Sequence, residues 1–447
     1  MLKKISLLCL VITSVALLTF SVSAQSTATD TYSGDIAFDW FDLQLELAQS
    51  TPGFTPPVVS RAFAYSGVAL YEAVVPGMPD HQSLAGQLNG LDDLPQPIAG
   101  VEYDWRVVAN SALYEITHYM YFNTSEENFD KMNALYDSWQ TTLEAELSPA
   151  VMEASQTQGR VVANAILIWS LTDGGYQGQL DNFPTSYIPE TGDGLWVSTP
   201  RPDGEPLPAL QPYWGDNRTF IVNKDEQCLL EPPPEYSIEE GSVFYEEAME
   251  VYETVNNLTA EENEIALFWA DDPGITSTPP GHSTSITSQV LRQENATLDV
   301  AAVAYATVGI SQADAFILGW YYKYHYNLIR PITYIQNVID PTWNTPVISD
   351  PVVTPPFPEY PSGHSVQSGA AAQVLTDLFG DNYAFTDHTH DALGFEPRTF
   401  ESFYSFADEA AISRLYGGIH YRAAIILGVE NGKCIGDVVS DIIFTTD

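Results

Sequence analysis

Residues 301–330 read AAVAYATVGISQADAFILGWYYKYHYNLIR, an apolar and aromatic stretch that ends directly before Pro331. A residue that precedes proline is biased away from the helical region, so the stretch predicts one long apolar helix that closes at Arg330. Lys323 and Arg330 are seven residues apart, and seven residues of an α-helix make about two full turns. We therefore expect the two cations to share one face of this helix.

Cations are scarce in the rest of the chain, which makes this pair informative. The 447 residues include 16 lysines and arginines against 59 aspartates and glutamates, and the formal net charge is −43. So acidic a chain is unsuited to binding nucleic acid or an anionic membrane surface, and most of its acidity is expected on a solvated surface. Two surface cations at a helix end are the ordinary explanation of such a pair. In a helix this apolar, a buried anion explains the pair better, because buried charges need partners.

Residues 1–24 have the pattern of a secretory signal peptide. Lys3 and Lys4 precede an apolar run, and small residues follow it as a cleavage site. We see no later run of membrane length, so the mature protein is expected to be soluble, without a membrane span, and secreted or periplasmic. Its oligomeric state cannot be inferred from these features.

The mature chain keeps two cysteines, Cys228 and Cys434, because Cys9 is removed with the signal. Two cysteines so far apart cannot form a disulfide-framework domain or a zinc cluster. In an oxidising compartment they either pair with each other or stay free.

Helical periodicity dominates the mature chain. Apolar residues recur at three- and four-residue spacing in long segments, of which the first four are 58–75, 107–122, 127–147 and 150–171. Residues 173–236 are instead rich in Gly, Pro, Asp and Trp, and we interpret them as an ordered irregular connection because they keep aromatic residues. The sequence therefore predicts an all-α protein in two halves, 25–236 and 237–447.

A second stretch, FPEYPSGHSVQSGAAAQVLTDLFG at 357–380, places Ser362, Gly363 and His364 at the start of an alanine-rich helix. The free backbone N–H groups and the dipole of a helix start favour an anion, and Gly363 allows the backbone to approach it closely. An ordinary N-cap serine produces the same pattern.

A third stretch, ISRLYGGIHYRAA at 412–424, carries Arg414 to the end of a helix that Gly417 and Gly418 interrupt. On a continuous helix, Arg414 and His420 would point about 120° apart, so this break is needed if both are to face one site. The alternative for His420 is a structural histidine with satisfied hydrogen bonds.

Together the three stretches form a pattern that is far more specific than each alone. The blocks are Lys323-x6-Arg330-Pro331, Pro361-Ser362-Gly363-His364 and Ser413-Arg414-x5-His420. They resemble the three-block motif of the superfamily that joins type 2 phosphatidic acid phosphatases, bacterial acid phosphatases and vanadium-dependent haloperoxidases. The general helical layout is similar to that of the haloperoxidase branch.

The resemblance implies two helical bundles, with a vanadate site in the C-terminal bundle that phosphate can also occupy. The residues implied to hold the oxyanion are Lys323, Arg330, Ser362, Gly363, His364, Arg414 and His420. Among them, His420 would be the axial ligand of vanadium, or the nucleophile of a phosphatase. His364 would be the general acid/base, and Lys323 would polarise bound peroxide.

The haloperoxidase branch also implies a place for the halide, because Trp320 and Phe357 match aromatic positions on the halide side of the pocket. Core packing is the ordinary role of such residues. Residues 268–282 look like an entrance segment of secreted bacterial haloperoxidase-like proteins. The partners implied are hydrogen peroxide, a halide and a small organic acceptor. Two alternatives stay open, a soluble acid phosphatase acting through a phosphohistidine and a non-catalytic oxyanion-binding protein.

The chain departs from the family pattern at Ala424, because many members have an aspartate four residues after the axial histidine. We expect another acceptor to orient the imidazole of His420, and Asp437 and Asp391 are candidates.

Three other histidines have less specific surroundings. His388 and His390 are expected on one side of an extended segment, as a metal site or as a polar loop near the site mouth. His282 follows Pro279-Pro280-Gly281, a sequence that predicts a turn at the entrance.

Overall fold

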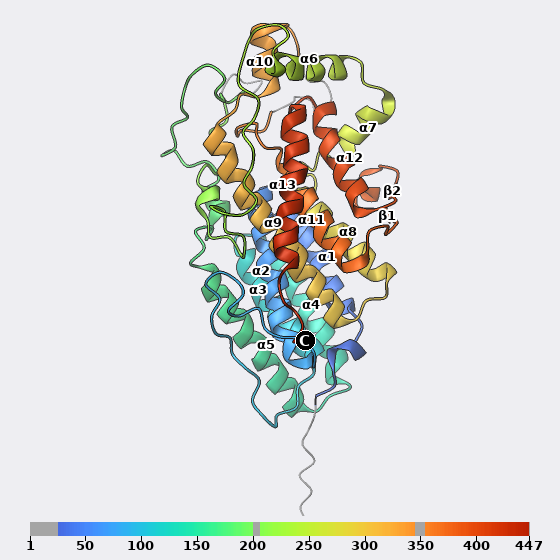
Figure 1. Cartoon of the computed structure of the whole chain (residues 1–447). Coiled ribbons are helices and arrows are strands. Elements are labelled where there is room, and N and C mark those ends of the chain that lie inside the picture. Colours follow the sequence, from blue (N-terminus) through green and yellow to red (C-terminus); the bar gives the residue numbers. More distant parts are fainter. Residues whose placement is uncertain (1–25, 200–205, 345–353, 447) are drawn as a thin grey trace, which may run out of the picture.

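A computed structural model describes residues 26–199, 206–344 and 354–446 of the chain. The predicted signal peptide lies outside the described residues. Within these ranges the chain forms α-helices joined by irregular segments, together with one antiparallel hairpin of β1 (Phe385–Asp387) and β2 (Arg398–Phe400) (Figure 1). The fold is all-α, as the sequence predicts.

The first half of the chain contributes five helices, and the four segments predicted there are all helical. The helices are α1 (Asp35–Ser50), α2 (Pro56–Val74), α3 (Trp105–Met120), α4 (Glu126–Glu144) and α5 (Pro149–Ser170). Side-chain caps begin three of them, because Asp104, Ser125 and Ser148 each accept a backbone N–H of the first turn.

The described part of the connection at 173–236 is irregular, with short 3-10 turns and buried tryptophans. One of its attachments to the core is a carboxylate in α9 (Leu298–Tyr326). Both oxygens of Asp314 accept backbone N–H groups, from Phe220 at 2.6 Å and from Ile221 and Val222 at 3.0 Å. Burial nevertheless raises the pKa of Asp314 to about 6. The described part of the connection is therefore ordered, as expected. The division into two halves stays a prediction.

The second half surrounds a group of three helices, α9, α11 (Gly363–Phe379) and α13 (Arg422–Ser440), which lie side by side in Figure 1. Close approach of α11 and α13 depends on Gly369, where a Cβ would lie 2.6 Å from the carbonyl oxygen of Val429. The remaining helices are α6 (Val243–Asn256), α7 (Ala260–Phe268), α8 (Thr278–Gln293), α10 (Pro331–Val338) and α12 (Phe403–Tyr416).

The long helix that contains Lys323 is shorter at its C-terminus than the sequence predicts. It ends at Tyr326, because Asn327 adopts a left-handed conformation with φ of 47°, a backbone state that asparagine tolerates well. Arg330 is then an extended residue that precedes α10. The prediction that Lys323 and Arg330 share a helix face is therefore wrong, since only Lys323 is helical.

Two helices, α2 and α9, are long and apolar enough to cross a membrane, contrary to the expectation that no such run follows the signal. Both are core helices here, since 100% and 89% of their most apolar windows are buried. They pack against each other at the centre of the molecule.

Cys228 and Cys434 are paired, and their disulfide bond joins the irregular connection to α13. It closes a loop of 206 residues, so we expect its removal to lower the free energy of unfolding by about 2–4 kcal/mol. Urea unfolding of the Cys228→Ala/Cys434→Ala variant measures this loss, with the oxidised parent protein as the reference. A loss under about 1 kcal/mol would show that the bond does little for stability.

Candidate active site

Lys323 is fully buried in the last turn of α9. Its Nζ donates to the carbonyl oxygens of Glu359 at 2.9 Å and Pro358 at 3.2 Å, and to that of Pro361. Burial lowers the pKa of Lys323 well below its usual range, and the neighbouring charge of Arg330 lowers it further. These carbonyl groups fix the position of Nζ without neutralising its charge.

Two arginines are buried beside this lysine. Arg330 Nε donates to Phe357 O and Nη1 to Ile419 O, both at 3.0 Å. Arg414, 2% exposed, donates from Nη2 to Ala266 O at 3.3 Å. Burial lowers the pKa of each guanidinium to about 10. Backbone carbonyl groups hold both side chains without neutralising them. Each guanidinium therefore keeps its charge and can bind an anionic ligand.

Ser362 and Gly363 form the start of α11. The Ser362 hydroxyl oxygen accepts Ser365 N–H at 3.3 Å, so it is an N-cap, as the ordinary explanation of the motif proposed. This contact leaves the hydroxyl proton free to donate. At Gly363 an added Cβ would lie 3.6 Å from Trp320 and 3.9 Å from Lys323, at ordinary contact distance. The protein itself does not require glycine there, but a ligand that approaches the backbone does.

His364 follows Gly363 in the first turn of α11 and lines a cavity at this helix start. Its Nε2 is buried and has no hydrogen-bond partner within the described part of the chain. Burial, reinforced by the charge of Arg414, lowers the pKa of His364 well below its usual range. A neutral imidazole with an unpaired buried nitrogen is suited to exchange a proton with a bound ligand.

His420 reaches the pocket because α12 ends at Tyr416 and Gly418, with φ of 69°, turns the chain. The helix break predicted from the glycines is confirmed. His420 Nε2 lies 3.4 Å from Arg330 Nη1. Burial lowers the pKa of His420 well below its usual range, and Arg330 and Lys323 lower it further.

The other ring nitrogen of His420 contacts a residue that sequence analysis missed. Its Nδ1 lies 2.7 Å from Oε1 of Glu359, a fully buried residue whose pKa burial raises to about 8. Neither Asp437 nor Asp391 is this acceptor, and Asp391 instead accepts from an exposed histidine. A signal was present in the sequence, since Glu359 is the one acidic residue in FPEYPSGH.

Several of these groups line a cavity of about 200 Å³. Trp320 and Phe357 form part of its apolar wall, with ring centroids 5.0 Å apart. The Phe357 ring also covers two cations, with its centroid 4.8 Å from the guanidinium carbon of Arg330 and 5.0 Å from Nζ of Lys323. The other lining residues are Pro56, Leu210, Ala270, Asp271, Asp272, Pro273, Pro279, Phe316, Pro355, Pro356, Gly363, His364, Arg414, Ile419 and His420.

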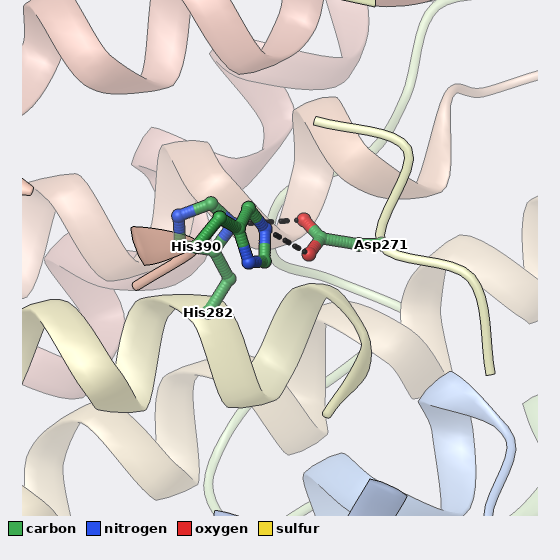
Figure 2. A group of neighbouring side chains, drawn as sticks. All are labelled: Asp271, His282 and His390. Carbon is green, nitrogen blue, oxygen red and sulfur yellow. Dashed lines mark hydrogen bonds and ion pairs between the residues drawn. The ribbon is translucent and has the colours of Figure 1, made fainter. Parts of the chain in front are cut away.

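A buried ionic cluster lies against this cavity (Figure 2). His282 Nδ1 lies 2.9 Å from Asp271, His282 Nε2 lies 2.7 Å from Asp387, and His390 Nε2 lies 3.1 Å from the second oxygen of Asp271. Asp271, His282 and His390 offer ligand atoms within 4.8 Å of one another and could hold a metal ion. The hydrogen bonds of His282 are also satisfied without a metal ion, because each of its two ring nitrogens contacts a carboxylate.

Two predictions about these histidines are wrong. His282 lies within α8, whose first turn contains Pro279 and Pro280, because proline is favoured at the first positions of a helix. His388 and His390 do not share one side, since His388 is exposed and His390 is buried against Asp271.

The pocket as a whole suits an oxyanion. Lys323, Arg330 and Arg414 are buried around a helix start, and the mutual repulsion of such cations would be relieved by a bound anion. His420 Nε2, beside Arg330, would offer a ligand atom from a further direction. All residues predicted for the site are therefore brought together, and their individual roles stay predictions.

Comparison with known proteins agrees with this geometry. Residues 303–445 match the family model described as the VCPO second helical-bundle domain. The chain is 24% identical over 332 residues to the vanadium chloroperoxidase of Curvularia inaequalis, a match that covers 56% of this chain and only 54% of that relative.

Solved structures extend the likeness to most of the chain. A bacterial vanadium-dependent iodoperoxidase is 39% identical, with a TM-score of 0.83, and the match covers 93% of this chain and 98% of that one. A holo-type bacterial vanadium-dependent chloroperoxidase is 16% identical, with a TM-score of 0.64, and the match covers 88% of this chain and 92% of that chain. At this identity the likeness shows the fold alone. The chain therefore belongs to the vanadium-dependent haloperoxidase family, whose cofactor is vanadate.

Proposed function

We propose that this protein binds vanadate and oxidises iodide with hydrogen peroxide, giving hypoiodous acid and water from iodide, peroxide and a proton. The observation that carries the proposal is the buried pocket in which Lys323, Arg330 and Arg414 surround the helix start at Gly363, with His420 Nε2 beside them. Iodide is favoured because the relative with 39% identity is an iodoperoxidase.

Each pocket residue has a part in this proposal. Lys323, Arg330 and Arg414 would neutralise the oxyanion, Ser362 and the Gly363 N–H would donate to it, and His420 Nε2 would be a ligand of vanadium. Bound vanadate supplies the Lewis-acidic centre at which peroxide becomes reactive toward a halide. The unpaired Nε2 of His364 would exchange a proton with hydrogen peroxide in the pocket. Lys323 would place positive charge beside the bound oxyanion.

The aromatic wall would hold the weakly hydrated halide and exclude water. Trp320 and Phe357 present ring surface beside the cations, and iodide, the largest and softest of the three common halides, fits such a surface best. A small organic acceptor then reacts with the hypoiodous acid. We also propose that the protein is secreted or periplasmic, on the basis of residues 1–24.

The direct test is to incubate the purified protein with orthovanadate and measure peroxide-dependent oxidation of iodide, bromide and chloride. Hydrolysis of p-nitrophenyl phosphate is measured on the vanadate-free protein in parallel. We expect iodide oxidation that requires vanadate. Phosphatase activity that vanadate inhibits, without halide oxidation, would instead establish the acid phosphatase. Oxyanion binding without turnover would leave a non-catalytic binding protein.

Replacing Phe357 by leucine should separate halide handling from oxyanion binding. We expect kcat/KM for iodide to fall about 10-fold or more, the effect of reshaping an apolar pocket, while phosphate affinity changes less than about 3-fold. The matched control is Phe244→Leu, which alters a buried phenylalanine of a separate core cluster. Equal losses in both variants would assign Phe357 to packing alone.

A further inference from the structure

Ala424 lies four residues after His420, the position at which the family resemblance implies an aspartate that orients the imidazole. A methyl group cannot accept a hydrogen bond, so the ring of His420 needs an acceptor from another segment. The structure supplies one from the extended segment before α11, because Glu359 Oε1 lies 2.7 Å from His420 Nδ1. Both side chains are buried, at 0% and 3% exposure.

A second contact of the same oxygen favours His420 Nδ1 as the donor. Glu359 Oε1 also lies 2.9 Å from the backbone nitrogen of Tyr421, which can only donate. Oε1 therefore presents a lone pair in this corner of the pocket, and an ionised Glu359 accepts at Oε1 from both nitrogens. With Glu359 ionised, His420 Nδ1, 2.7 Å from the same atom, is the donor and carries a proton.

The opposite ring nitrogen has matching surroundings. His420 Nε2 lies 3.4 Å from Arg330 Nη1, and a guanidinium can donate but never accept. A proton on Nε2 would point at another donor, whereas a lone pair on Nε2 faces it favourably. Both contacts thus favour a neutral ring with the proton on Nδ1 and the lone pair of Nε2 in the cavity.

The backbone of Glu359 is fixed as firmly as its side chain. Its N–H donates to Leu328 O at 3.0 Å, and its carbonyl oxygen accepts from Nζ of Lys323 at 2.9 Å. One residue therefore contacts both Lys323 and His420, which come from segments almost one hundred residues apart. A shift of this residue would move two pocket groups together.

We propose that Glu359 is the positioning residue of the oxyanion site, fixing His420 in the Nδ1–H tautomer so that Nε2 is free to bind vanadium. It replaces, from another segment, the aspartate absent at position 424. The inference rests on the proposed function, because it assigns Nε2 to vanadate. Carboxylates that orient a metal-binding histidine usually contribute 10- to 100-fold in metal affinity.

Three variants of the full mature chain test this assignment. Glu359→Ala removes the acceptor, and Glu359→Gln keeps an oxygen, which the Tyr421 N–H holds toward the ring. Glu72→Gln is the matched control, because Glu72 is a buried carboxylate outside the pocket that also accepts a backbone N–H. Circular dichroism and urea unfolding establish that each variant is folded.

The first readout is the dissociation constant of orthovanadate from each vanadate-free protein, measured by calorimetry. We expect Glu359→Ala to weaken binding about 10- to 100-fold, and Glu359→Gln and Glu72→Gln to stay within about 3-fold of wild type. Equal binding by Glu359→Ala and wild type would overturn the proposal. Failure of the wild-type protein itself to bind vanadate would instead overturn the proposed function.

The second readout does not require vanadate. The chain has 8 histidines, so ¹⁵N-histidine labelling, with His420→Ala to assign the signal, reports the protonation of each ring nitrogen of His420. We expect a protonated Nδ1 and a bare Nε2 in wild type and in Glu359→Gln, and a mixture of tautomers in Glu359→Ala. A protonated Nε2 in the wild-type protein would overturn the proposal even if every variant failed to fold.

Discussion

Replacing His420 by alanine is expected to abolish vanadate-dependent iodide oxidation, with a loss of about 10³-fold or more. The side chain places a ring nitrogen, Nε2, 3.4 Å from Nη1 of Arg330 in the pocket. Phosphate affinity should stay within about 10-fold of wild type, because Lys323, Arg330 and Arg414 remain. Initial rates with peroxide and iodide, together with calorimetric titration of inorganic phosphate, measure both effects.

An exposed histidine on α9 offers a matched control for this substitution. His325 lies in the last turn of α9, is exposed and stacks on Tyr321, so His325→Ala should keep full activity. Iodide oxidation by the His420→Ala protein at near wild-type rate would place the reaction elsewhere. Loss of phosphate binding together with activity would show that the substitution disrupts the whole pocket.

Replacing His282 by glutamine is expected to lower the free energy of unfolding by about 3–5 kcal/mol, the usual cost of breaking a buried ion pair. Its ring lies between the carboxylates of Asp271 and Asp387, at 2.9 and 2.7 Å. Glutamine carries no charge, so the two buried carboxylates would lose the cation that lies between them. Urea unfolding at pH 7 measures the loss. The control is His388→Gln, whose exposed contact with Asp391 contributes under about 1 kcal/mol.

The same histidine predicts a dependence of stability on pH. Burial alone would lower the pKa of His282, but Asp271 and Asp387 outweigh it and raise this pKa to about 10. A group with a raised pKa stabilises fully below its unfolded value of about 6.5, and this contribution disappears as the pH rises through about 10. Wild type should therefore lose stability between pH 7 and pH 10, while His282→Gln should lose much less. Parallel curves for the two proteins would show that His282 is neutral.

Local patterns in the sequence were sufficient for the helices and for the composition of the pocket. The spacing of apolar residues predicts α2 to α5, because the period of an α-helix is local and each buried face must repeat with it. Lys323, Arg330, the Ser362-Gly363-His364 helix start, Arg414 and His420 were all identified, since cations in an apolar setting and a helix interrupted by two glycines are features of short stretches.

Contacts between distant segments could not be predicted in this way. The sequence indicates that His420 needs an acceptor, but only the fold shows that it is Glu359, because that contact depends on how the segment before α11 crosses the start of α13. Likewise, Arg330 reaches the pocket from an extended residue after Asn327 rather than from the helix.

The partners of the remaining histidines and of the cysteines were likewise decided by the tertiary structure alone. His282 and His390 meet at Asp271 from segments more than one hundred residues apart, and Cys228 pairs with Cys434 across 206 residues. The sequence by itself determined the helices, the pocket cations and the family resemblance, since each depends on residues that are close together in the chain. The partner of each buried polar group was decided by packing, because burial makes a partner necessary but does not specify which one.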